Sequence, residues 1–131
     1  MQYYTIGETA RLLGVSVDTA RRWADAGRFP VLREDGRRLV EGRELAAFCV
    51  QLAQESAVDA ESELRTSVRN AFSGIVTRVV LGDVSAQVEI QAGPHRVVSL
   101  LTREAVEELG LEVGSQAVAR VKSTNVHIDL A

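Results

Sequence analysis

The spacing of apolar residues changes from a helical period to a strand period near the middle of this 131-residue chain. In the first part, apolar residues recur every three to four positions, as they do on the buried face of a helix. From Phe72 onward, short apolar runs alternate with polar residues, which is typical of half-buried strands. We therefore predict an α+β chain of two domains, over residues 1–54 and 67–131, joined by a linker or helix extension over residues 55–66.

Composition restricts the class of protein. Cys49 is the single cysteine, so an intrachain disulfide framework and a multi-cysteine zinc site are excluded. No apolar run approaches the roughly 18 residues that span a bilayer, and the first residues show no signal-peptide pattern, so we expect a cytoplasmic protein. Domains of about 55 and 65 residues lie near the size at which one hydrophobic core is barely sufficient. We therefore expect a homo-oligomer, at least a dimer.

The net charge of −3 is unevenly distributed along the chain. Residues 1–52 carry a net charge of +1 and contain eight arginines but no lysine, whereas residues 53–66 carry −3. The planar guanidinium group binds phosphates and base edges with two parallel hydrogen bonds. The first domain is therefore compatible with a nucleic-acid partner.

Two short helices with a glycine-containing turn are predicted near the N-terminus. Thr5 and Glu8 have the spacing of a capping box, and Gly14 follows the apolar repeat as a C-cap. Ser16 is a suitable N-cap for a second helix that begins at Val17 and is closed by Gly27. The buried face of that helix is expected to consist of Val17, Ala20, Trp23 and Ala24. This arrangement matches the spacing of a helix-turn-helix.

The exposed face of the second helix and the segment after it contain the candidate DNA contacts. In a helix-turn-helix the start of the second helix meets base edges in the major groove. Asp35 and Gly36 lie between two β-prone runs, which predicts a hairpin with an arginine-rich tip, or wing. A third helix over residues 43–54 completes the core with Leu45, Phe48, Cys49 and Leu52. The predicted double-stranded DNA contacts are Ser16, Thr19, Arg21, Arg22, Arg33, Arg37 and Arg38; on the helix alone, an ordinary solvated face is an equal alternative.

Residues 3–53 resemble the winged helix-turn-helix of the MerR and excisionase superfamily. The residues that carry the resemblance are Tyr4–Ala10, Leu13–Ser16, Thr19–Trp23, Gly27 and the Arg37-Arg38 pair. The chain lacks the long dimerisation helix and the cysteine ligands of the metal-sensing members. Metal sensing by that chemistry is therefore not expected.

The second domain is predicted to be a small OB-like β-barrel. Strands are expected from Phe72, over residues 84–92 and 95–102, from Gln116 to Lys122 and from Val126 to Leu130. A short helix from Arg103 to Leu109 interrupts them. Five short strands with one inserted helix are typical of an OB-like barrel.

Hydrogen-bond donors gather in three segments of this domain. A tetrahedral dianion requires several hydroxyl, amide or cationic donors and few competing carboxylates. Glu104 is the acidic residue in or directly beside these segments. The candidate donors in these segments include Ser67, Arg69, Asn70, Thr102, Lys122, Ser123 and Thr124. From composition alone, ordinary loop residues remain the alternative interpretation.

Residues 66–130 resemble the molbindin, or TOBE, domain of molybdate-binding proteins. The resemblance rests on Ser67–Asn70 with Gly74–Val76, Leu101-Thr102, Val106–Leu111, Gly114 and Lys122–Val126; Val68 and Ser123 depart from the family's usual motifs. It implies a molybdate or tungstate ligand at a boundary between subunits. In that site Ser67, Arg69 and Asn70 come from one segment and Lys122, Ser123 and Thr124 from another. It also implies paired barrels, in some relatives up to a hexamer.

Three functional hypotheses follow from the sequence. His95 and His127 are isolated and no catalytic constellation or phosphate-binding glycine loop is present, so an enzyme is not expected. The leading hypothesis is a molybdate- or tungstate-responsive DNA-binding transcriptional regulator without membrane association. The alternatives are an intracellular molybdate buffer or storage protein, and an architectural DNA-binding protein that uses the barrel only to oligomerise.

Overall fold

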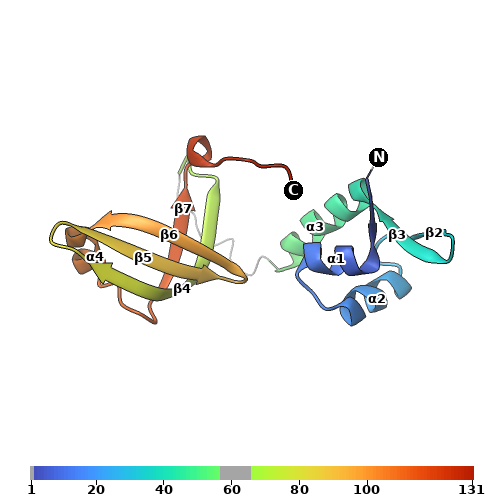
Figure 1. Cartoon of the computed structure of the whole chain (residues 1–131), viewed down its shortest axis with the longest axis horizontal. Coiled ribbons are helices and arrows are strands. Elements are labelled where there is room, and N and C mark those ends of the chain that lie inside the picture. Colours follow the sequence, from blue (N-terminus) through green and yellow to red (C-terminus); the bar gives the residue numbers. More distant parts are fainter. Residues whose placement is uncertain (1, 57–65) are drawn as a thin grey trace. The chain divides into compact units, whose positions relative to one another are not determined.

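The computed structural model describes residues 2–56 and 66–131. The chain divides into two compact units, Met1–Glu63 and Leu64–Ala131 (Figure 1). The linker predicted over residues 55–66 lies outside the described residues except at its two ends. No helix within the described ranges is long and apolar enough to cross a membrane.

The first unit contains three helices and a small antiparallel sheet. In chain order its elements are β1 (Tyr3–Thr5), α1 (Ile6–Leu13), α2 (Val17–Asp25), β2 (Leu32–Glu34), β3 (Arg37–Glu41) and α3 (Gly42–Ser56). The sheet order is β1-β3-β2, so β3 pairs with both neighbours. β1 could not be predicted from the sequence, because three residues are too few to show an alternating pattern.

Side-chain caps fix the two short helices of the helix-turn-helix as predicted. The Glu8 backbone N–H donates to Thr5 Oγ1 at 3.2 Å, and the Thr19 backbone N–H donates to Ser16 Oγ at 3.1 Å. Gly14 is the left-handed C-cap of α1. α2 ends at Asp25, two residues before the predicted Gly27.

The core of the first unit joins all three helices to the hairpin. Phe48 of α3 contacts Phe29 and Trp23, with ring centroids 5.0 and 5.6 Å apart. Val17 was predicted to be buried but is 39% exposed. It occupies the first position of α2, where the side chain tilts back toward the helix N-terminus and past the core. The fully packed members are Ile6, Ala10, Ala20, Phe29, Val40, Leu45 and Phe48.

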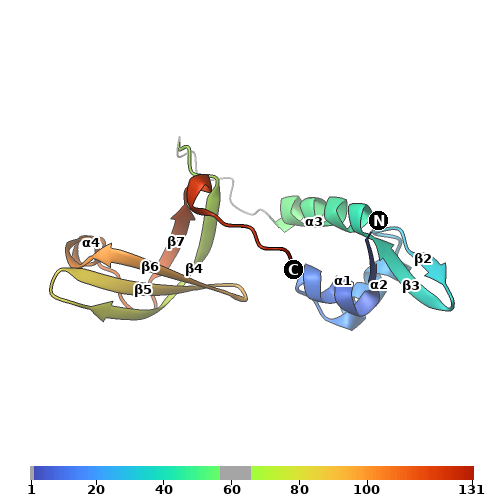
Figure 2. The same ribbon diagram turned by 45° about the horizontal axis from the view of Figure 1, so that its top comes forward.

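The second unit is an open, curled antiparallel sheet with one α-helix. Its elements are β4 (Asn70–Leu81), β5 (Ser85–Ala92), β6 (His95–Thr102), α4 (Arg103–Leu109), β7 (Gln116–Val121) and the 3₁₀ turn η1 (Ser123–Asn125). The sheet order is β6-β5-β4-β7. β4 is long and curved: its first half pairs with β7 and its second half with β5 (Figure 2).

A close approach between strands explains one glycine of β4. A Cβ atom on Gly74 would lie 2.3 Å from the Gln91 carbonyl oxygen, far inside van der Waals contact. Gly74 therefore permits the bend at which β4 turns from β7 toward β5. The core beneath this bend consists of Val76, Ala86, Val88, Ile90 and Val106.

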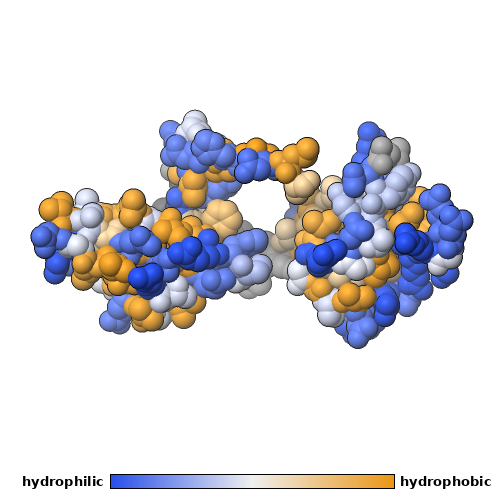
Figure 3. Space-filling model, in the orientation of Figure 1, coloured by the Kyte–Doolittle hydropathy of each residue, from blue (hydrophilic) through white to orange (hydrophobic). Residues whose placement is uncertain are grey.

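The strand predicted from Val126 to Leu130 does not form. These residues are extended and belong to no strand, so the described part of the second unit contains four strands instead of five. Ile128 and Leu130 are almost fully exposed, at 89% and 101%. Hydrophobic side chains also lie on the surface of the second unit in the space-filling view (Figure 3). The prediction is wrong because a strand needs a hydrogen-bonded neighbour, and this segment has none among the described strands. The sheet is consequently open rather than closed into a five-stranded barrel.

Candidate functional site

Polar side chains connect along the first turns of α2. The Ser16 hydroxyl donates to Thr19 Oγ1 at 2.9 Å, and the Arg22 guanidinium donates to the same oxygen at 3.3 Å. Arg21 lies 3.7 Å from the Asp18 carboxylate, and both side chains are exposed. The structure thus places Ser16, Thr19 and Arg22 in one hydrogen-bonded series at the start of the helix.

The predicted hairpin forms between β2 and β3. Asp35 and Gly36 have φ angles of 51° and 76°, and two successive positive values are the geometry of a type I′ turn. Arg33 lies opposite Arg38, and Glu34 lies opposite Arg37. Because adjacent residues of a strand project to opposite faces, the side chains of Arg37 and Arg38 leave β3 in opposite directions.

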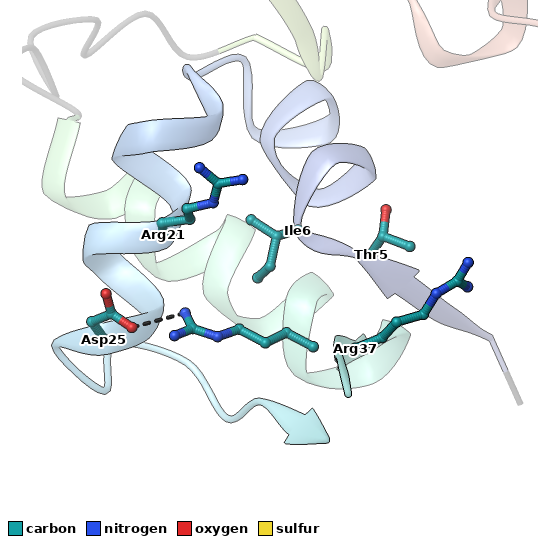
Figure 4. Close-up of a pocket in the computed structure, with 6 residues that line it drawn as sticks. Thr5, Ile6, Arg21, Asp25 and Arg37 are labelled. Carbon is teal, nitrogen blue, oxygen red and sulfur yellow. Dashed lines mark ion pairs between the residues drawn. The ribbon is translucent and has the colours of Figure 1, made fainter. Parts of the chain in front are cut away.

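A shallow cavity of about 480 Å³ lies where α1, α2 and β3 meet (Figure 4). Its lining residues are Thr5, Ile6, Arg21, Asp25, Arg37 and Arg38. Arg38 Nη1 lies 2.8 Å from Asp25 Oδ1, whereas Arg37 points away from this pair. This contact could not be predicted from the sequence, because no local spacing links two residues that are thirteen positions apart.

The two main donor segments of the second unit meet at one end of its sheet. Asn70, the first residue of β4, pairs with Val121, the last residue of β7, and Asn70 Nδ2 donates to the Val121 carbonyl at 3.2 Å. Ser67 and Arg69 precede Asn70, and Lys122 follows Val121 directly. Both segments therefore come together within one chain, and their meeting does not require a second subunit.

The donors at this end of the sheet are accessible to a ligand. The exposed residues are Ser67, Arg69, Lys122, Ser123 and Thr124. Arg69 Nη1 donates to the Thr66 carbonyl at 3.0 Å, which holds the guanidinium over its own loop. Residues 66–70 and 122–125 include no aspartate or glutamate. Hydroxyls and two cations without a competing carboxylate favour an anion.

Thr102 is not brought to this cluster within one chain. It pairs with Ser85, and the neighbouring Ala86 pairs with Leu81 at the far end of β4 from Asn70. Its hydroxyl accepts a hydrogen bond of 3.0 Å from the Ala105 backbone N–H and thereby caps α4. In a single chain, Thr102 is a helix cap.

Glu89 has a perturbed pKa but lies in neither cluster. It is 7% exposed on β5 and accepts a hydrogen bond from Arg96. That hydrogen bond lowers the pKa of Glu89 below its usual value of 4.5, and the positive charges of Arg96 and Arg78 act in the same direction. Glu89 therefore remains ionised at neutral pH and contributes to the sheet rather than to ligand chemistry.

The two clusters correspond to two known domain types. Residues 3–49 match the model of a helix-turn-helix domain, and residues 66–128 match that of the TOBE domain. The chain is thus a helix-turn-helix protein with a TOBE domain. It is 40% identical over 63 residues to molybdenum-pterin-binding protein 2 of Clostridium pasteurianum. This match covers 47% of this chain and 93% of that protein. The chain belongs to this molybdenum-pterin-binding protein family.

Two further similarities concern the second unit. The chain is 38% identical over 64 residues to the molybdenum transport protein ModE of Herbaspirillum seropedicae, a match that covers 48% of this chain but only 24% of that relative's length. A solved molybdate-binding protein from Sporomusa ovata superposes with a TM-score of 0.50 at 27% identity and covers 51% of this chain and 100% of its own. This likeness assigns the fold of the second unit.

Proposed function

We propose that this chain is a molybdate- or tungstate-responsive DNA-binding transcriptional regulator. The observation that carries the proposal is the pairing of Asn70 with Val121, which joins two acid-free donor segments in a chain that also contains a helix-turn-helix. The names of the relatives support molybdate as the ligand, since both the Clostridium and the Sporomusa proteins are described as binding molybdenum compounds.

The DNA-binding part of the proposal places α2 in the major groove. Ser16, Thr19, Arg21 and Arg22 project from the exposed face of that helix and supply contacts to bases and phosphates. Arg33 and Arg37 lie on the hairpin, which acts as a wing along the phosphate backbone. The resemblance of residues 3–53 to the winged helix-turn-helix of the MerR and excisionase superfamily supports this arrangement.

The oxyanion part of the proposal uses both donor segments. Lys122 and Arg69 supply positive charge, and the side chains of Ser67, Asn70, Ser123 and Thr124 supply hydrogen bonds. A molybdate dianion would be stabilised by several charge-assisted hydrogen bonds, each about twice as strong as a neutral one. Sulfate is smaller and would leave some of these donors unsatisfied.

The open sheet supports a homo-oligomer. Within the described residues, β6 and β7 each have one edge without a strand neighbour. A groove of about 530 Å³ lies between them, lined mainly by apolar side chains such as Val97, Leu101 and Val118. The alternating, exposed Val126, Ile128 and Leu130 have the pattern of a strand that fits an apolar groove. We infer that this segment pairs with another copy, which would also allow Thr102 of a second copy to approach the site.

Calorimetric titration and thermal melting with molybdate test the proposal. A ligand at a hundredfold excess over its dissociation constant stabilises the folded protein by about 2.7 kcal/mol. We expect Lys122→Ala to abolish the shift in melting temperature, and Ser67→Ala to weaken binding by about 1.5–3 kcal/mol. Arg37→Ala, in the other unit, is the matched control and should keep the full response. Absence of any shift at millimolar molybdate would contradict the proposal.

A further inference from the structure

One ion pair connects the end of α2 to strand β3 of the wing. Asp25 is the last residue of α2, and its Oδ1 lies 2.8 Å from Nη1 of Arg38 in β3 (Figure 4). The Arg38 side chain is 30% exposed and that of Asp25 is 62% exposed. The contact therefore links two elements that are far apart in sequence and that each belong to the proposed DNA surface.

The strand register directs the Arg38 side chain toward the core side of the domain. Val40 projects from the same face of β3 two residues later and is fully buried. Arg33 lies directly opposite Arg38, and like charges in that position destabilise a pair of strands. The Asp25 carboxylate offsets this repulsion. Arg37, in contrast, projects from the other face and lies opposite Glu34.

The position of Asp25 is unfavourable for a residue that only faces DNA. Among the described residues that line the cavity, it is the one carboxylate beside three arginines. A negative charge on a surface that approaches phosphates weakens their attraction. Its presence is explained if the carboxylate acts on the protein rather than on the DNA.

We propose that Asp25 is a positioning residue that fixes the wing relative to the recognition helix through Arg38. In this arrangement Arg38 acts by holding the wing, and Arg33 and Arg37 make the phosphate contacts. The proposal rests on the proposed DNA-binding function and identifies a residue that tunes it.

The direction in which Asp25→Asn changes the DNA affinity distinguishes a positioning role from a purely electrostatic one. Asp25→Asn removes a negative charge, so a purely electrostatic role predicts tighter DNA binding. The positioning role predicts binding about two- to fivefold weaker, as expected for loss of a partly exposed ion pair. Asp35→Asn is the matched control: it makes the same change at the wing tip, and Asn-Gly suits the type I′ turn. It should bind DNA as well as or better than the unmodified chain, and Asp25→Glu should restore most of the affinity lost in Asp25→Asn.

The test uses the full chain with a duplex selected from random sequence and fluorescence anisotropy as the measurement. In an Arg38→Gln background, Asp25→Asn should cause no further loss, because the partner is already absent. Hydrogen exchange without DNA should be faster for backbone amides of Arg37–Glu41 in Asp25→Asn but not in Asp35→Asn. If the unmodified chain binds no DNA, the proposed function is wrong, and exchange still reports whether the ion pair holds the wing. Unchanged exchange together with equal or tighter DNA binding by Asp25→Asn would overturn the positioning role.

Discussion

The two units differ in how completely each buries its own apolar surface. Among the described residues, the first unit exposes five large hydrophobic side chains and the second exposes thirteen, although their lengths are similar. The first unit has a core of aromatic contacts around Phe48 and capped helices. The first unit is therefore complete within one chain, whereas the second is suited to being completed by another copy.

The sheet edges show the same contrast. The hairpin of the first unit is short and carries Arg33, Glu34 and Arg37, and charged short strands discourage further pairing. The second sheet ends at β6 and β7, where Leu100 is 78% exposed and Val118 is 46% exposed. Exposed apolar edge strands favour association. We therefore propose that the self-contained unit binds DNA and that the open unit mediates assembly.

The largest expected effect is on the core of the first unit. Phe48→Ala should destabilise that unit by about 3–5 kcal/mol, because it removes a buried ring and leaves a cavity. Trp23 is the single tryptophan of the chain, so its fluorescence reports this transition alone. The matched control is Phe72→Ala in β4, where the side chain is 37% exposed and the Trp23 transition should not move. If the strand signal of the second unit in Phe48→Ala is lost in the same transition as the Trp23 fluorescence, the two units do not unfold independently.

The next effect concerns assembly of the second unit. Ile128→Asp should weaken self-association on the order of a hundredfold, because an unpaired carboxylate would be buried at the interface. Leu12→Asp places the same charge at an exposed position of the first unit, 58% accessible, and should leave the oligomer intact. Sedimentation velocity over a range of protein concentrations measures both. If both variants self-associate to the same extent, the claim that only the second unit mediates assembly would be contradicted.

A smaller effect is expected at the wing. Arg37→Ala should weaken DNA binding and reduce the slope of log K against log salt by about 0.9, as for the loss of one phosphate contact. Molybdate binding should be unchanged, because Arg37 lies in the other unit. Anisotropy titrations at several salt concentrations provide the slope. An unchanged slope would exclude Arg37 from the phosphate contacts.

The smallest effect concerns acid stability of the second unit. The pKa of Glu89 is lowered by its hydrogen bond from Arg96, so its contribution is present above the usual value of 4.5 and is lost as pH falls through the lower, folded pKa. Glu89→Gln should therefore reduce the loss of stability on acidification in the second unit, with no change in the Trp23 transition. Melting followed by circular dichroism between neutral pH and about pH 3 tests this sign. A steeper acid dependence in Glu89→Gln would contradict it.

Local signals in the sequence were sufficient for most elements. The caps at Thr5 and Ser16, the Asp35-Gly36 turn and the helix from Arg103 to Leu109 follow from residue type and spacing, and all are confirmed. Contacts between distant residues were not accessible in this way, and the Asp25–Arg38 pair is the clearest case.

The segment from Val126 to Leu130 shows a different limit. Its alternating pattern predicts a strand that does not form, because a strand requires a partner and no pattern within the segment specifies one. The meeting of Asn70 with Val121 likewise depends on the order of the strands in the sheet. The oxyanion ligands themselves were predicted by resemblance to a family and stay a prediction.

The most direct test of the central claim is the affinity of the full chain for a selected DNA duplex with and without molybdate. If the chain is a molybdate-responsive regulator, its dissociation constant for DNA should change by at least about fivefold, equivalent to a coupling of about 1 kcal/mol, and sulfate at the same concentration should have little effect. Lys122→Ala should bind DNA normally and lose the response. Molybdate binding that leaves the DNA affinity unchanged would contradict the regulator and would indicate a buffer or storage protein instead.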